Sequence, residues 1–277
     1  MLLACVGVLA ISVPAVRSLA TKPTNEAVTA LYAFGDSYSD TGAGFVAGNG
    51  PTAVAYFARH LGLEMQTPDQ SSSSRASINF AVSGAGTGEG SGQRIGGALI
   101  GMGMREQANR WVQRVHSGTS TFDPASTLFF VAGGLNDAKV PTEEVVTNLH
   151  RTVQTLHGAG ARKFLIARLP EHIPQFTAVG RRLNPAIETL VAALSRELPD
   201  SEIMLSDWGA FFDDVLQRAR EFGIDDTENK CAGRAIFGED PAPCLAPERH
   251  FYYHASHPST KVHSIVGCRL YQEWRNR

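Results

Sequence analysis

The sequence lacks several features that would direct it to particular functions. Its 277 residues contain no Cys-x-x-Cys pair, which disfavours a structural zinc site, and no Gly-x-Gly-x-x-Gly, which disfavours a dinucleotide site. There is no basic block, and 25 Lys and Arg are set against 27 Asp and Glu. Proteins bind phosphate backbones through such blocks, so we expect no nucleic-acid partner. No internal repeat and no heptad pattern is visible, and we expect a monomer.

Long apolar runs are also scarce, and the one that exists is at the N-terminus. Residues 1–20 are apolar until Arg17 and end in Ser18-Leu19-Ala20, a small-x-small pattern. This predicts a secretory signal peptide cleaved before Thr21; the alternative is an uncleaved membrane anchor. No other stretch approaches the ~20 apolar residues of a membrane span. We therefore expect residues 21–277 to form a single secreted domain, soluble and without stable membrane insertion.

Cysteine is rare, and only three of the four cysteines lie beyond the predicted signal peptide. Cys231 and Cys244 bracket a polar, Pro-rich loop and are the best candidates for a disulfide, which an oxidising compartment permits. Closing this loop contributes roughly 3 kcal/mol in the chain-entropy model. Cys268 falls in a predicted C-terminal helix, where we expect a buried free thiol.

Apolar strand-like runs alternate with amphipathic helical runs along the chain, and this alternation predicts an α/β protein with a parallel sheet covered on both faces. The predicted strands are 29–34, 78–82, 127–132, 163–167 and 202–206. The predicted helices are 52–61, 105–115, 143–157, 181–198, 210–222 and 259–276. Active residues in such folds gather at the carboxyl ends of the strands.

Three of the predicted strands end next to a glycine. Beside each of these glycines stands a polar residue that can take part in catalysis. Ser37 follows the first strand, and a serine needs an adjacent base to act as a nucleophile. It also needs donors aimed at the developing oxyanion, and the backbone N–H groups of Ser37 and Gly84 and the side-chain amide of Asn136 qualify. The base must come from elsewhere in the chain, and His257 precedes the last predicted helix.

With these residues in place, the chain resembles the GDSL, or SGNH, hydrolase family of esterases and lipases. Four blocks occur in the family's order across residues 29–270, and a fifth segment, Asn49-Gly50-Pro51 followed by 54–58, is similar to the plant and fungal branch. The blocks are Gly-Asp-Ser-Tyr-Ser-Asp-Thr-Gly at 35–42, Asn-Phe-Ala-Val-Ser-Gly-Ala at 79–85, Gly-Leu-Asn-Asp at 134–137 and His-Pro-Ser-Thr at 257–260.

The resemblance implies a flavodoxin-like three-layer α/β/α fold with a central parallel sheet of about five strands. It also implies serine ester hydrolysis with no cofactor and no metal. Ser37 would be the nucleophile, His257 the base, and Gly84 and Asn136 oxyanion donors. The Gly-x-Ser-x-Gly elbow of the α/β-hydrolases is absent, which separates the chain from that class.

One position departs from the family pattern. The last block should read Asp-x-x-His, but His254 stands where the aspartate is expected. In serine proteases, converting the triad acid to its amide costs ~10⁴ in turnover. We favour a working Ser–His dyad, in which His254 or a backbone carbonyl accepts the Nδ1–H of His257. A carboxylate from the preceding loop, Glu248 or Asp240, is the second interpretation.

Two further interpretations of His254 remain open. In one interpretation the site is impaired, and the protein binds a ligand without turnover. In the other, His254 and His257 form a metal pair with His250 or His263 as a third ligand, although no metal-site spacing in the sequence is complete. Asp36 and Asp40 are expected to brace the first loop rather than act as the triad acid.

We therefore predict a secreted serine esterase acting on acetyl or short-chain esters of carbohydrates or lipids. The alternative is a catalytically impaired carbohydrate- or lipid-binding protein on the same fold, and His254 is the residue that favours it. The glycine-rich stretch 84–103 is predicted to be a mobile loop beside the cleft. The absence of a long apolar lid favours short acyl chains.

Overall fold

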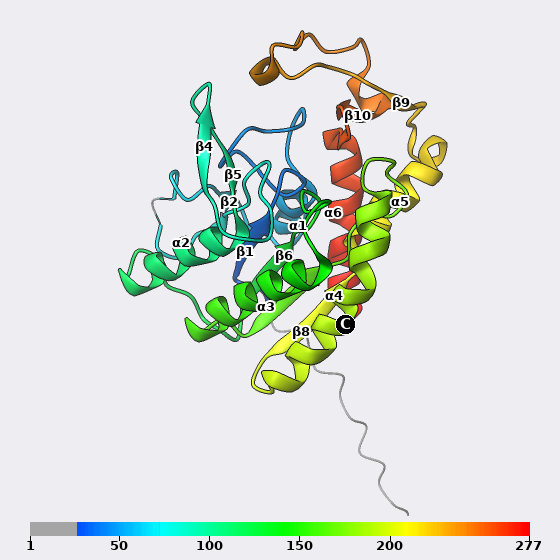
Figure 1. Cartoon of the computed structure of the whole chain (residues 1–277). Helices are drawn as coiled ribbons and strands as arrows, with labels where there is room; N and C mark the ends of the chain where they lie inside the picture. Colours follow the sequence, from blue (N-terminus) through cyan, green and yellow to red (C-terminus); the bar gives the residue numbers. More distant parts are fainter. Residues whose placement is uncertain (1–26, 72) are drawn as a thin grey trace, which may run out of the picture.

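A six-stranded parallel sheet forms the centre of the fold. In the computed structural model, which describes residues 27–71 and 73–277, its strands run in the order β2-β3-β1-β6-β7-β8 (Figure 1). All neighbouring strands are parallel. The predicted signal peptide, residues 1–20, lies outside the described residues. The strands are β1 Ala30–Gly35, β2 Met65–Gln66, β3 Ser77–Asn79, β6 Thr127–Ala132, β7 Lys163–Ala167 and β8 Glu202–Ser206.

The strand order confirms the predicted flavodoxin-like arrangement. With the two-residue strand β2 set aside, the other five strands are arranged in the chain order 2-1-3-4-5 that defines this fold. The order reverses between β1 and β6, and ligands bind beyond the carboxyl ends of strands at such a point. Both strands are buried at every position, as expected for continuous apolar runs in a sheet covered on both faces.

Helices cover both faces of the sheet and complete the three layers. The helices α1, α5 and α6 pack in one group, whereas α2, α3 and α4 pack in another, and Figure 1 shows the sheet between the two groups. None of the helices in the described part of the chain is long and apolar enough to cross a membrane. The helices are α1 Ala53–His60, α2 Met104–His116, α3 Thr142–Gly158, α4 Thr177–Glu197, α5 Trp208–Gln217 and α6 Thr260–Arg275.

Two small sheets stand at the carboxyl end of the large sheet (Figure 1). One is the antiparallel hairpin of β4 Ser91–Ile95 and β5 Ala98–Met102, so the stretch expected to be a mobile loop contains ordered strands instead. The other consists of β9 Asp226–Lys230, β10 His250–His254 and β11 His257–Pro258. Short 3-10 turns, Ala219–Phe222, Ala235–Phe237 and Pro247–Arg249, connect these elements.

The second predicted strand ends earlier than its apolar pattern suggests. It was expected over 78–82, but β3 ends at Asn79. The Asn79 carboxamide Oδ1 accepts the N–H of Ala81 at 3.0 Å, and its Nδ2 donates to Ser39 O and to Thr41 Oγ1. The backbone still pairs with β1 beyond this point, through Phe80 N–H to Ala33 O at 2.8 Å and Val82 N–H to Gly35 O at 3.2 Å, while the Asn79 side chain binds the loop after β1. Asn79 thereby joins the second block of the site to the first, a role that the apolar periodicity does not reveal.

Candidate active site

The side chains of Ser37 and His257 meet at the carboxyl end of the sheet, although 220 positions separate them in the chain. The Ser37 Oγ lies 2.7 Å from the His257 Nε2. Ser37 follows β1, and His257 opens β11 directly before α6. Both residues are partly exposed, so a solute can reach the pair. A neutral imidazole with its Nε2 facing a hydroxyl can accept the serine proton.

Asp40 ties the nucleophile loop to the loop that follows β3. Its carboxylate accepts the N–H groups of Gly42 at 2.9 Å and Ser83 at 2.8 Å, and also the Ser83 hydroxyl at 3.0 Å. Asp36 holds the nucleophile loop itself, because its Oδ1 accepts the N–H of Tyr38 at 3.0 Å. Both aspartates thus contact backbone donors as loop braces and neither contacts His257.

The backbone N–H groups of Ser37 and Gly84 have no acceptor among the residues that the structure describes. Gly84 is exposed and has φ +80°, a conformation that favours glycine, and its N–H is free to face a ligand. Asn136 follows β6 and is exposed, and its Nδ2 donates to Ala85 O at 2.9 Å. That bond holds the amide beside the Gly84 loop and leaves its second N–H available.

A backbone carbonyl takes the place in which the family pattern has a carboxylate. The His257 Nδ1 lies 2.9 Å from Ala255 O. This bond requires Nδ1 to carry the proton, which leaves Nε2 as the acceptor toward Ser37. Glu248 and Asp240, the two carboxylates considered from the sequence, are both exposed, and the structure does not bring either one to His257.

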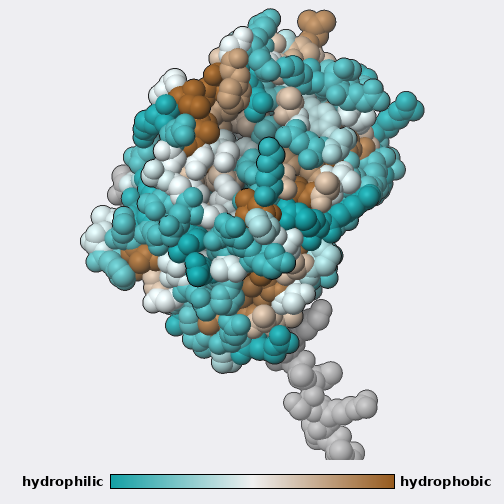
Figure 2. Space-filling view, viewed as in Figure 1, coloured by the Kyte–Doolittle hydropathy of each residue, from teal (hydrophilic) through white to brown (hydrophobic). Residues whose placement is uncertain are grey.

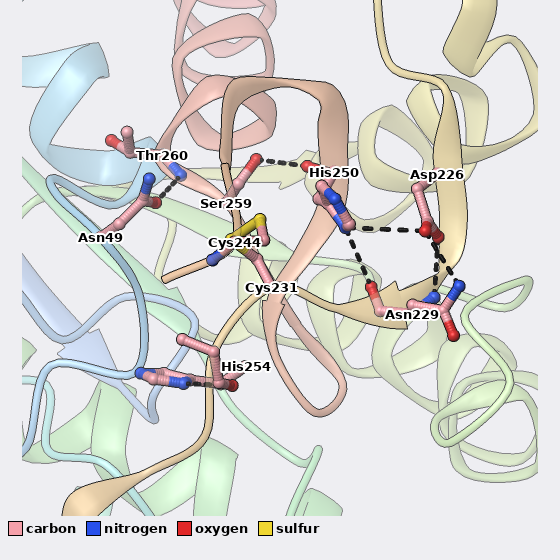
Figure 3. Close-up of a disulfide and its surroundings, with 10 residues drawn as sticks. Asn49, Asp226, Asn229, Cys231, Cys244, His250, His254, Ser259 and Thr260 are labelled. Carbon is pink, nitrogen blue, oxygen red and sulfur yellow. Dashed lines mark hydrogen bonds and ion pairs between the residues drawn. A yellow bond between two sulfur atoms is a disulfide. The ribbon is translucent and has the colours of Figure 1, made fainter. Parts of the chain in front are cut away.

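His254 does not contact the Nδ1 of His257. The two residues are partners across the β10–β11 turn, but the His254 Nδ1 lies 3.1 Å from Ala232 O (Figure 3). His254 is buried, and burial lowers its pKa, which favours its neutral form. It supplies neither a negative charge nor the hydrogen-bond acceptor that orients His257.

Electrostatics at the site favour a neutral base. The pKa of His257 is lowered to about 4, chiefly by burial and in smaller part by Arg234 and His254, although the bond to Ala255 O acts in the other direction. Burial raises the pKa of Asp36 to about 7, because its Oδ2 is buried without a partner and Asp137 lies nearby. The imidazole is thus ready to accept a proton at pH 7, but its cation lacks a fixed counter-charge.

The predicted disulfide between Cys231 and Cys244 is present, and Cys268 is a free, half-buried thiol. The N–H of Cys231 donates to Tyr252 O at 3.1 Å, and that of Ala232 donates to Tyr253 O at 2.8 Å. These bonds fasten the loop to β10 beside His254 (Figure 3). A disulfide is compatible with an oxidising compartment.

The histidines considered as further metal ligands lie apart from one another. His250 faces Asp226 and Asn229 in Figure 3, with Nδ1 3.7 Å from the Asp226 carboxylate. His263 is buried, and its Nδ1 accepts the N–H of Ala53 at 3.1 Å. Within the described residues, no three His, Cys, Asp or Glu side chains are arranged to hold a metal ion.

Comparison with known proteins identifies the family of the chain. Residues 31–270 match the GDSL-like Lipase/Acylhydrolase family. The chain belongs to this family. It is thereby placed among the carboxylic ester hydrolases.

Individual relatives are distant. One GDSL esterase/lipase of Arabidopsis thaliana is 23% identical over 294 residues, which cover 85% of this chain and 81% of that protein. Another is 22% identical over 142 residues, which cover 43% of this chain and 41% of that protein. A lipolytic G-D-S-L family protein from Veillonella parvula has a TM-score of 0.45 at 14% identity and covers 86% of this chain and 94% of that chain.

Proposed function

We propose that the protein is a secreted serine esterase with a Ser37–His257 dyad, in which the Ala255 carbonyl replaces the usual aspartate. The observation that carries the proposal is the hydrogen-bond chain from Ser37 Oγ to His257 Nε2 and from His257 Nδ1 to Ala255 O. The disulfide and the apolar N-terminal segment support secretion.

Each atom of this arrangement has a task in acyl transfer. The Ser37 Oγ attacks the ester carbonyl carbon while the His257 Nε2 takes the hydroxyl proton. The N–H groups of Ser37 and Gly84 and the amide of Asn136 donate to the carbonyl oxygen as it becomes negative. His257 returns the proton to the leaving alcohol, and water then releases the acyl group through the same base.

The surroundings of Gly84 support a small acyl group. A Cβ at Gly84 would lie 3.2 Å from the Ile100 Cγ2, so the side chain of Ile100 stands directly beside this glycine. Ile100 lies in β5 of the β4–β5 hairpin. Figure 2 shows a hydrophobic patch over this hairpin, at the upper left of the molecule. We therefore propose acetyl or other short-chain esters as substrates.

We expect p-nitrophenyl acetate to be hydrolysed, and the rate to fall along the series acetate, butyrate and octanoate. Ile100 restricts the space beside Gly84, and longer chains lose transition-state binding when they do not fit. The measurement is kcat/KM for each ester with purified residues 21–277. Ile100→Ala should raise the octanoate-to-acetate ratio and leave acetate hydrolysis nearly unchanged.

Two outcomes would change this proposal. A maximum at octanoate or longer would contradict the short-chain substrate class. No hydrolysis of any ester above the background of Ser37→Ala would instead support the alternative considered from the sequence, a carbohydrate- or lipid-binding protein on the same fold, which the missing carboxylate beside His257 favours.

A further inference from the structure

The turn that presents Ala255 to His257 has an unusual backbone. Ala255 and Ser256 connect β10 to β11, with His254 and His257 as partners on either side. Ser256 has φ +61°, and it is the one non-glycine residue with a positive φ among the described residues. Serine seldom adopts this conformation, so surrounding contacts must hold it. The orientation of the Ala255 carbonyl depends on this turn, because the Ala255–Ser256 peptide plane rotates with the φ of Ser256.

Two side chains from outside the hairpin hold Ser256. The Tyr38 hydroxyl donates to Ser256 O at 2.6 Å. The Ser256 hydroxyl donates to the carboxamide oxygen of Gln175. Tyr38 itself is fully buried, with its ring packed edge-on against Phe176 and Phe212. A rigidly packed phenol therefore holds the strained turn from the core side.

We propose that Tyr38 is a positioning residue for His257, because its hydroxyl fixes the turn that presents the Ala255 carbonyl to the imidazole. This inference rests on the proposed dyad. A side-chain carboxylate that accepts the Nδ1–H of a catalytic histidine sets the orientation of the ring itself. In this protein a peptide group sets the orientation of the His257 ring. A peptide group in a two-residue turn can rotate unless other residues anchor it. Burial raises the pKa of Tyr38, which keeps the phenol protonated as a donor.

The position of Tyr38 in the chain strengthens the inference. It directly follows Ser37, and its ring centroid lies 5.6 Å from that of His257. One short segment therefore carries the nucleophile and anchors the turn that orients the base.

The test is Tyr38→Phe, which removes the hydroxyl and keeps the ring. We expect kcat for p-nitrophenyl acetate to fall by about 10- to 100-fold with KM nearly unchanged, since small misplacements of a catalytic group cost rates of this size. The pKa of His257, followed by NMR of the ring protons with His257→Gln for assignment, should also fall. The bond to Ala255 O raises this pKa, so a weakened bond lowers it. The acid limb of the pH–rate profile should move to lower pH.

The matched control is Tyr32→Phe, because Tyr32 is also a fully buried tyrosine but lies in β1, with its ring packed against Trp111 and Phe129. It should leave kcat and the His257 pKa unchanged. Introducing His254→Asp into Tyr38→Phe should recover turnover, because a carboxylate supplies the orienting acceptor that the turn no longer provides. The other ionisable groups that act on His257 are Arg234, His254 and His263, and Tyr38→Phe leaves all three in place.

The results separate this inference from the proposed function. The NMR titration reports on His257 even if the wild-type protein hydrolyses no ester. If Tyr38→Phe does not fold, Gln175→Ala, a surface change at the other tether, should lower the His257 pKa in the same direction. Wild-type kcat and an unchanged His257 pKa in Tyr38→Phe would overturn the inference, as would equal effects of Tyr38→Phe and Tyr32→Phe.

Discussion

Ser37→Ala and His257→Ala should each lower kcat for p-nitrophenyl acetate by about 10⁴-fold or more, and the double variant should be no worse than either single variant. The hydroxyl is a poor nucleophile without the imidazole 2.7 Å away, and the imidazole has nothing to activate without the hydroxyl, so the two act as a unit. The measurement is steady-state hydrolysis with burst-phase detection of the acyl-enzyme.

Ser39→Ala is the matched control for Ser37→Ala. Ser39 is buried two positions along the same loop, and its hydroxyl has no partner among the described residues. We expect wild-type turnover in this variant. Additive losses in the Ser37 and His257 double variant, or substantial activity in Ser37→Ala, would show that the serine is not the nucleophile.

Asn136→Ala should lower kcat by about 10²- to 10³-fold with a small change in KM, because an oxyanion donor acts mainly in the transition state. The amide is exposed, and its bond to Ala85 O at 2.9 Å points it toward the Gly84 loop. Asn136→Asp should be at least as inactive, since a carboxylate of similar shape offers no donor and repels the oxyanion.

Affinity for a transition-state analogue separates this role from a structural one. A boronic acid that forms an anionic adduct with Ser37 should bind Asn136→Ala more weakly, while the thermal midpoint of the unliganded protein should change little. A loss of less than about tenfold in kcat would mean that the N–H groups of Ser37 and Gly84 suffice to stabilise the oxyanion.

The central sheet was predictable because its strands carry a strong physical signal. Strands β6, β7 and β8 begin and end where the apolar runs predict, since a parallel sheet covered on both faces demands continuous apolar sequence. The hairpin of β4 and β5 was missed because β4 is mostly exposed, and an exposed, glycine-rich strand shows no alternation. The predicted helix 210–222 divides after Gln217 into α5 and a 3-10 turn, a break that helical periodicity does not reveal.

The candidate site was predictable in its side chains and not in its backbone. Residues at the ends of β1 and β6 were expected near one another because parallel strands end at the same edge of the sheet. The acceptor for His257 is a carbonyl of Ala255, and every residue has a carbonyl, so no residue type marks it. The role of Tyr38 depends on the positive φ of Ser256, a backbone conformation that a serine in the sequence does not predict.

The pH dependence of kcat/KM tests the central claim most directly, namely that a backbone carbonyl stands in for the triad carboxylate. The base must be neutral to work, so activity is lost as pH falls through its pKa. Asp36, with a pKa raised to about 7, can add a second inflection, which Asp36→Asn would remove.

The profile should be recorded by pH-stat from pH 3 to 9, with circular dichroism to confirm folding at each pH. The account predicts that the acid limb in Asp36→Asn has its midpoint near 4, the pKa to which burial lowers His257. A midpoint clearly above the ordinary histidine value of about 6.5 would contradict the account, because a raised pKa would require a carboxylate beside His257.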